Sequence, residues 1–213
     1  MFSSFFCSSN LLPLITLLPL LGAIGVFLLP SKEVQTIRRV GLFTSFITFF
    51  ISLFLWIFFD RSYVRFQFVW DLAWIPSSNL NFSLGIDGIS IFFVLLTTLL
   101  IPLCLLASWD SVKKAYKEYV IAFLFMEALL ILVFCVRDLL LFYIFFEGVL
   151  IPMFIIIGVW GSRERKVRAS YMFFLYTLLG SVLMLLSILY VYFRVGTTDY
   201  ETLLCFDFTF TEQ

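Results

Sequence analysis

The chain has 213 residues, of which 62% are hydrophobic and 13% are charged, and its formal net charge is zero. Soluble globular domains do not have this composition, so the sequence predicts an integral membrane protein. A neutral chain without a basic patch gives no indication of nucleic-acid binding. The sequence contains no histidine, which excludes Ser-His and Cys-His catalysis and histidine-based metal or haem sites.

The four cysteines are scattered at spacings that fit no zinc or iron–sulfur pattern. The sequence also has no Gly-rich phosphate loop and no dinucleotide-binding fingerprint. We therefore expect that this chain binds no cofactor and no metal ion, and that it performs no redox chemistry itself.

The apolar runs are long, unbroken and without a period of two, which favours membrane-spanning helices over barrel strands. A run of about 20 apolar residues at about 1.5 Å each is long enough to cross the hydrocarbon layer. The first run lacks a basic leader and a cleavage site, so we expect it to be a retained span. We predict six helices, over residues 11–29, 40–59, 89–107, 118–136, 139–160 and 170–193.

Two stretches outside these helices are long enough to have structure of their own. The connection 60–88 contains an alternating stretch, Val64–Trp70, which predicts a short strand or an interfacial element. The tryptophans of this connection would suit the headgroup level of a membrane. The tail Gly196–Gln213 is polar to mixed, and we expect it to be an interfacial or loosely held segment.

The basic residues are distributed unequally between the two sides of the predicted bundle. The side opposite loops one, three and five has only Arg61, Arg65, Arg137 and Arg194. The positive-inside rule therefore places loops one, three and five on the cytoplasmic or matrix side, and both termini on the other. These three loops and the adjoining helix ends contain Lys32, Arg38, Arg39, Lys113, Lys114, Lys117, Arg163, Arg165, Lys166 and Arg168.

Glu147 lies in the middle of the apolar run Leu139–Trp160. A charged side chain at the centre of a span costs about 3 kcal/mol on insertion scales, and such residues normally face a bundle interior. We predict a proton or ion site at Glu147; the alternative is a glutamate that a neighbouring helix satisfies for packing alone. Pro152 cannot donate to the Gly148 carbonyl, so we expect a kink that frees this carbonyl beside Glu147.

A second carboxylate, Glu127, is predicted to lie at a similar depth on the preceding helix. Glu127 is ten residues before Arg137, and Glu147 is nine residues after Asp138, so each lies about 15 Å from the turn between them. Two carboxylates in a low dielectric cannot both ionise cheaply, and we expect at least one to hold a proton near neutral pH. Every lysine and arginine lies in a loop or at a helix end, so we expect a buried counter-charge to come from another chain.

Two motifs, LGIDGIS at residues 84–90 and FFEGVLIPMF at residues 145–154, give the chain a family resemblance. Together with the sequence around them, they resemble the chain 4 family of the proton-pumping NADH:ubiquinone oxidoreductase, respiratory complex I. The resemblance extends from about Ser31 to Thr198. Related antiporter-like subunits share looser forms of both motifs.

The resemblance implies an all-α integral membrane fold that forms the N-terminal part of an antiporter-like inverted repeat. Residues 1–110 would be an N-terminal three-helix segment, 111–195 the start of the repeat, and 196–213 a short tail. In this family the glutamate that matches Glu147 takes part in proton translocation, and the carboxylate of the preceding helix matches Glu127. The resemblance also implies the mitochondrial inner membrane, contact with lipid and other membrane-arm subunits, and flavin, iron–sulfur clusters and quinone in other subunits.

The chain departs from this family by ending after its sixth predicted span. The lysine of a broken seventh helix, the expected partner of the glutamate, is missing together with the second repeat. Three explanations compete: the gene is split, the protein is naturally truncated and retained for assembly, or the sequence is a fragment. We expect a split gene, with a second chain that supplies the C-terminal half, because the cut falls in a loop. Two other functions stay open: a non-pumping structural or assembly subunit, and a subunit of a related cation/proton antiporter.

Overall fold

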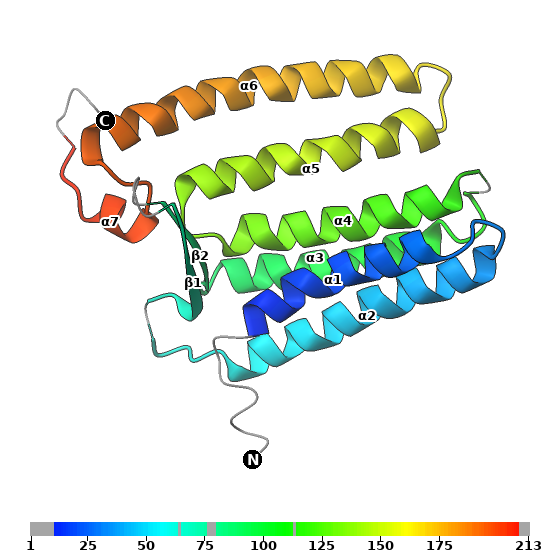
Figure 1. Cartoon of the computed structure of the whole chain (residues 1–213), viewed down its shortest axis with the longest axis horizontal. Helices are drawn as coiled ribbons and strands as arrows, with labels where there is room; N and C mark the ends of the chain where they lie inside the picture. Colours follow the sequence, from blue (N-terminus) through cyan, green and yellow to red (C-terminus); the bar gives the residue numbers. More distant parts are fainter. Residues whose placement is uncertain (1–10, 64, 76–79, 113, 209–213) are drawn as a thin grey trace.

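The computed structural model describes residues 11–63, 65–75, 80–112 and 114–208. Six long helices, each apolar enough to cross a membrane, confirm the predicted fold of an all-α multi-pass membrane protein (Figure 1). The helices are α1 (Leu11–Leu28), α2 (Val34–Phe58), α3 (Ser90–Ala107), α4 (Tyr116–Cys135), α5 (Leu139–Trp160) and α6 (Lys166–Val195). A two-stranded sheet, β1 (Gln67–Ile75) and β2 (Leu80–Ile86), and a short helix, α7 (Tyr200–Leu204), complete the described structure.

Helix α4 lies at the centre of the bundle and packs against α1, α2, α3 and α5. Helices α5 and α6 pack against each other on one side of α4 (Figure 1). More of α4 is buried than of any other span, whereas few residues of α5 and α6 are buried. A residue on α4 is therefore the best placed to be enclosed by protein on all sides.

Helix α5 has the predicted bounds because its ends are marked by local signals. The Asp138 carboxylate accepts hydrogen bonds from the Leu140 and Leu141 amides at 2.9 and 3.1 Å, which caps the first turn. Gly161 follows the last residue of the helix. The helix continues through Pro152, and the kink expected there stays a prediction.

Helices α2 and α6 begin earlier than predicted, at Val34 rather than residue 40 and at Lys166 rather than residue 170. The prediction followed the apolar runs, but the first turns of both helices are polar. A helix satisfies its own backbone hydrogen bonds, so it can extend past the hydrocarbon layer into water. Arg38 and Arg39 consequently lie inside α2, near its start.

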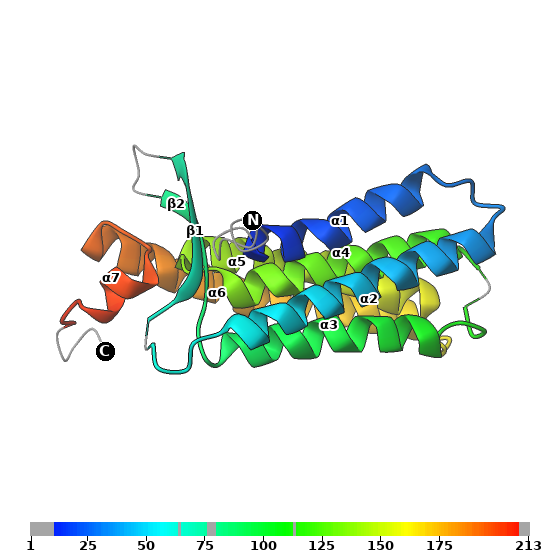
Figure 2. The same cartoon turned by 90° about the horizontal axis from the view of Figure 1, so that it is seen from below.

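The connection between α2 and α3 contains an antiparallel hairpin formed by β1 and β2. The alternating stretch predicted as a strand or an interfacial element thus overlaps β1, although Val64 lies outside the described residues. Phe82 of β2 packs edge-on against Trp70 of β1 and Phe145 of α5, with ring centroids 5.9 and 6.0 Å apart. These contacts attach the hairpin to the end of the bundle, where Figure 2 shows it beside α7.

The expectation of a loosely held tail is wrong for its described part. The Thr198 carbonyl accepts a hydrogen bond from the Leu139 amide, and the Tyr200 amide donates to the Arg137 carbonyl, both at 3.0 Å. Thr198 is fully buried, and its hydroxyl donates to Asp138 at 2.5 Å. The tail therefore docks on the turn between α4 and α5 as an additional short strand-like segment.

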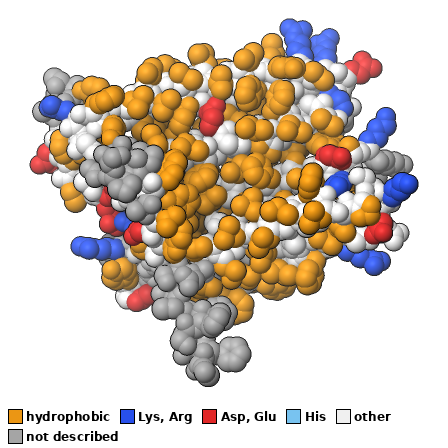
Figure 3. Space-filling view, in the orientation of Figure 1, with side chains coloured by type: hydrophobic (Ala, Val, Ile, Leu, Met, Phe, Trp, Pro, Cys, Tyr) orange, Lys and Arg blue, Asp and Glu red, His pale blue; other side chains and the backbone are white. Residues whose placement is uncertain are grey.

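The two ends of the bundle differ in charge as the sequence predicts. The α1–α2, α3–α4 and α5–α6 connections lie together at one end, and the hairpin and α7 lie at the other (Figure 1). Figure 3 shows most of the lysine and arginine side chains at the first of these ends, with a broad hydrophobic surface between the two ends. This arrangement fits one orientation of the bundle across a membrane.

Candidate functional site

Glu127 is fully buried in the middle of α4. Its Oε1 atom accepts a hydrogen bond from Thr48 Oγ1 of α2 at 3.0 Å. Its Oε2 atom is buried and has no hydrogen-bond partner among the described residues. A buried carboxyl oxygen without a partner is costly, so this atom is open to a proton, a water molecule or a polar group of another chain.

Glu147 is half-buried in the middle of α5. Its Oε2 atom is also buried and without a hydrogen-bond partner in the described part of the chain. A carboxyl group at the middle of a span is in a setting that makes it expensive in a membrane. Glu147 is thus less enclosed than Glu127.

The two carboxyl groups lie at similar depth on neighbouring helices, as predicted. Gly148 of α5 faces the Leu129 side chain of α4 at van der Waals distance. Continued along both antiparallel helices, this register places Glu127 opposite Leu150, so Glu127 and Glu147 differ in depth by about 4.5 Å. No hydrogen bond between them is found in the described part of the chain: Glu127 Oε1 accepts from Thr48 of α2, and the Oε2 atoms of both glutamates have no partner.

Arg38, the first basic residue within α2, is held by aromatic rings. Its guanidinium carbon lies 5.2 Å from the centroid of Trp109 and 4.8 Å from that of Tyr116. Cation–π contacts of this kind fix an arginine at the end of a span. Arg38 lies ten residues before Thr48 along α2, about 15 Å away, so it is not the counter-charge of Glu127.

Thr48 is the functional candidate that the sequence interpretation missed. Three fully buried hydroxyl residues, Ser45, Thr48 and Ser52, follow one another at spacings of three and four along α2. This spacing puts them on one face of the helix. In the sequence, the one indication that this face of α2 meets a polar group was the row of hydroxyl side chains along it.

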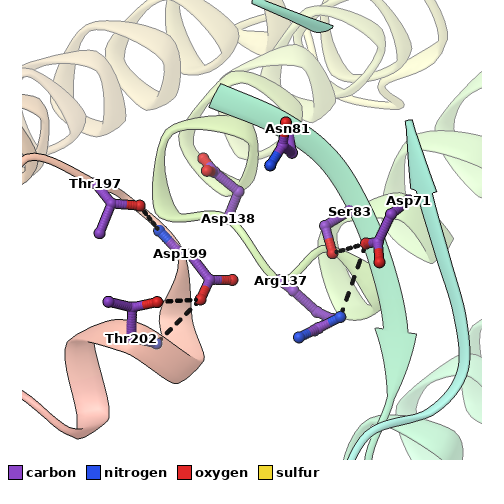
Figure 4. A pocket seen from close by; sticks show the side chains of 8 residues that line it. All are labelled: Asp71, Asn81, Ser83, Arg137, Asp138, Thr197, Asp199 and Thr202. Carbon is purple, nitrogen blue, oxygen red and sulfur yellow. Dashed lines mark hydrogen bonds and ion pairs between the residues drawn. The ribbon is translucent and has the colours of Figure 1, made fainter. Parts of the chain in front are cut away.

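A second polar region surrounds the turn between α4 and α5, at the end of the bundle with the hairpin. Arg137 lies between Asp71 of β1 and Glu201 of α7, with nitrogen–oxygen distances of 3.8 and 3.0 Å. Figure 4 shows Arg137 and Asp71 among the side chains around a cavity of about 420 Å³. The arginine joins three segments that are distant in sequence, so the structural role of this cluster is to hold the hairpin, the turn and the tail together. The residues that line the cavity are Asp71, Asn81, Ser83, Arg137, Asp138, Thr197, Asp199 and Thr202.

Two family models together match nearly the whole chain. The amino terminus of NADH-ubiquinone oxidoreductase chain 4 matches residues 10–137, and the transmembrane region of the NADH:quinone oxidoreductase/Mrp antiporter family matches residues 136–213. The two matches meet at the turn between α4 and α5.

Individual relatives agree with these matches. NADH-ubiquinone oxidoreductase chain 4 of Arabidopsis thaliana is 59% identical over 203 residues, which are 95% of this chain and 41% of the relative. The same protein of Marchantia polymorpha is 57% identical over 201 residues, which are 94% of this chain and 40% of the relative. The chain thus spans about two fifths of the length of these curated relatives.

A solved structure has the same fold. The structure described as respiratory complex I from Thermus thermophilus with bound NADH matches with a TM-score of 0.78 and 28% identity, over 93% of this chain and 40% of that chain. The match to the amino-terminal family model covers more than half of the 213 residues and includes α1 to α4 with Glu127. The chain therefore belongs to the NADH-ubiquinone oxidoreductase chain 4 family.

Proposed function

We propose that this chain is part of a proton-translocating membrane-arm subunit of NADH:ubiquinone oxidoreductase in the mitochondrial inner membrane. In this proposal Glu147 and Glu127 carry protons across the membrane while quinone is reduced in other subunits. The chain acts as a subunit of the enzyme and has no redox site of its own. Flavin, iron–sulfur clusters and quinone are bound by its partners.

One observation carries the proposal: each of two neighbouring spans has a glutamate at mid-depth with a buried, unpartnered carboxyl oxygen among the described residues. An ionisable group at this position is costly unless it is used, and proton relays are a common use. A carboxyl group in a low dielectric binds or releases its proton when a nearby charge moves. Glu127 and Glu147 are placed for this because their depths differ by only about one helical turn.

A proton relay of this kind needs a movable positive charge close to the carboxyl groups. Arg38 is about 15 Å from the level of Thr48, and Arg137 is bound to Glu201 at the end of the bundle. We therefore propose that a lysine or arginine of a second polypeptide, which carries the C-terminal part of the family fold, packs beside α5. Few residues of α5 and α6 are buried by the described part of this chain, which leaves room for it.

The test is Glu147→Gln in the assembled complex, which removes the charge and keeps the shape of the side chain. We expect NADH-driven proton translocation into sealed vesicles to fall at least about tenfold, because the substitution removes the group that binds the proton. The amount of assembled complex, measured on native gels, should stay close to wild type. Glu127→Gln is measured in parallel.

Glu118→Gln is the matched control. Glu118 lies on α4 as Glu127 does, but it is exposed in the first turn. Its substitution removes the same charge outside the hydrocarbon layer and should leave translocation unchanged. If Glu147→Gln also translocates protons at the wild-type rate, the chain has a structural or assembly role in the membrane arm instead.

The proposed second polypeptide has a direct test in mass spectrometry of the intact purified complex. We expect a chain that begins near the seventh helix of the family fold and contains a buried lysine. A complete complex in which no polypeptide carries the C-terminal part of the family fold would leave Glu147 without its counter-charge and would contradict the relay.

A further inference from the structure

Thr48 is fully buried on α2, and its hydroxyl group could be satisfied by a hydrogen bond within its own helix, without Glu127. A hydroxyl in an apolar setting needs a hydrogen bond, and in a helix it commonly donates to a carbonyl of the preceding turn. Thr98 of α3 does so with the Val94 carbonyl at 3.0 Å. The Thr44 carbonyl, 3.0 Å from Thr48 Oγ1, offers Thr48 the same bond. The additional contact with Glu127, from another helix, is therefore a specific feature.

The Thr48 hydroxyl has more acceptors than it can serve at once. The carbonyls of Thr44 and Ser45 and Glu127 Oε1 all lie 2.9 to 3.0 Å from Thr48 Oγ1. A hydroxyl has one hydrogen to donate and two lone pairs to accept with. When Glu127 is ionised, Thr48 donates to the carboxylate at Oε1; when Glu127 holds a proton on Oε2, Oε1 is the carbonyl oxygen of the acid and still accepts from Thr48.

The approach of α2 to α4 is set two helical turns away from this contact. A Cβ atom at Gly41 of α2 would lie 2.4 Å from Val120 Cγ1 of α4, so only glycine allows this separation. Thr48 is seven residues after Gly41, and Glu127 is seven residues after Val120. Seven residues return to the same face of a helix, so the Gly41–Val120 contact and the Thr48–Glu127 bond belong to one interface between two parallel helices.

We propose that Thr48 is a positioning residue for Glu127, whose hydroxyl stays bonded to the carboxyl group in either of its protonation states. The change between these states then leaves the hydrogen bond from Thr48 to Oε1 in place and needs no movement of either helix. Thr48 thereby holds Glu127 Oε1 on the α2 side and leaves Oε2 as the oxygen that exchanges the proton. The inference deepens the proposed function and rests on it.

Few other ionisable groups lie on the elements packed against α4. Helix α1 and strand β2 have none, and α3 has only Cys104. Helix α5 has Tyr143 and Glu147, and α2 has Arg38 and Arg39 near its start. The hydrogen bond from Thr48 is consequently the main polar contact of Glu127 among the described residues.

The test compares Thr48→Val, which removes the hydroxyl at constant shape, with Thr48→Ser, which keeps it. Infrared difference spectroscopy of the assembled complex gives the vibration of the Glu127 carboxyl group, identified by its loss in Glu127→Gln. We expect the band to shift in Thr48→Val and to return in Thr48→Ser. Proton translocation should fall about tenfold in Thr48→Val, the change expected for one lost hydrogen bond to a charged group.

Thr98→Val is the control, because Thr98 is an equally buried threonine that bonds Ser52 rather than Glu127. If the Glu127 band of Thr48→Val matches that of Thr98→Val, Thr48 only fills space and the inference is overturned. If Thr48→Val fails to assemble, Thr48→Ala and Thr98→Ala make the same comparison. Normal pumping by Glu127→Gln would refute the role of Glu127 in translocation, whereas the infrared band would still decide whether Thr48 holds its carboxyl group.

Discussion

Asp87 shows at the scale of a single residue how the sequence starts a span. Its carboxylate accepts hydrogen bonds from the amides of Ser90 and Ile89, at 2.6 and 3.2 Å, where α3 begins. Partial burial raises the pKa of Asp87, but the bonds from Ser90 and Ile89 outweigh burial and hold this pKa below its ordinary value of 3.8. Since the folded state binds the proton more weakly, Asp87 stabilises α3 at neutral pH.

The stabilisation from Asp87 is complete above pH 3.8 and is lost as the pH falls through the lower pKa of the folded state. Asp87→Ala should therefore reduce the amide protection of the first turn of α3 about fivefold at neutral pH, the usual effect of a lost helix cap. Below the pKa of the folded state, protection in wild type should fall toward that of the variant. Hydrogen–deuterium exchange of a peptide covering residues 87–92, corrected for the intrinsic rate at each pH, measures both effects.

Asp60→Ala is the control for this experiment. The Asp60 carboxylate accepts a hydrogen bond from the Ser62 hydroxyl, which lowers its pKa, but this residue is exposed and lies in the connection after α2. Exchange in α3 should be the same in Asp60→Ala and in wild type. Equal protection of α3 in Asp87→Ala and wild type at neutral pH would show that the Asp87 cap does not stabilise the helix.

At the scale of elements, α2 and α4 approach each other closely at Gly41 and Val120. Gly41→Ala would push a methyl group into Val120 Cγ1, and valine has little freedom to turn away because its side chain is branched at Cβ. We expect a loss of about 1–3 kcal/mol of stability, the usual cost of overpacking. Val120→Ala in the same chain should restore most of it. The thermal midpoint of the purified complex measures the loss and the recovery.

Gly25→Ala provides the comparison, because a Cβ atom at Gly25 of α1 would have no neighbour within 4 Å. A variant with alanine at this position should be at least as stable as wild type, since alanine is the better helix former. If Gly41→Ala and Gly25→Ala have equal thermal midpoints, the separation of α2 and α4 is not set by the glycine.

The elements also show where the sequence was sufficient and where it was not. The bounds of α5 were predictable because Asp138 and the glycine after Trp160 are local signals. The start of α2 at Val34 was not predictable, because a polar turn outside the membrane has no hydropathy signal. Docking of the tail was missed for another reason: Thr198 and Asp138 are 60 residues apart, and short-range patterns do not report such contacts.

The residues of the candidate site could likewise be predicted from the sequence only in part. Glu127 and Glu147 were visible in the sequence because a carboxylate in an apolar run is rare. Their depth followed from the helical rise and the short turn between α4 and α5. The hydrogen-bond partner of Glu127 could not be predicted in this way, because Thr48 is 79 residues away and threonine in a span commonly bonds its own helix. Only the hydroxyl row on one face of α2 pointed to it.

The whole molecule has a polarity that fixes its orientation in the membrane. The α1–α2, α3–α4 and α5–α6 connections lie at the end where most basic side chains gather (Figures 1 and 3). Translocation of basic loops across a membrane is unfavourable, so in the proposed location, the mitochondrial inner membrane, this end should face the matrix. The hairpin and α7 should face the opposite compartment.

Cysteine labelling in sealed vesicles of either orientation tests this topology. Ser162→Cys places an exposed thiol in the α5–α6 connection, and Cys205 is a natural exposed thiol after α7. A membrane-impermeant maleimide should modify the thiol at position 162 from the matrix side, and Cys205 only from the other side. Cys135 is fully buried and should react only after denaturation.

The maleimide labelling is measured in a chain in which Cys7 is replaced by serine, so that this thiol does not contribute to the signal. Ser31→Cys repeats the test in the α1–α2 connection, where Ser31 is exposed. Modification of positions 31 and 162 from one side and of Cys205 from the other requires an odd number of spans between α7 and each of these loops. Modification of all three from the same side would contradict the six-span arrangement, and with it the placement of Glu127 and Glu147 at mid-membrane.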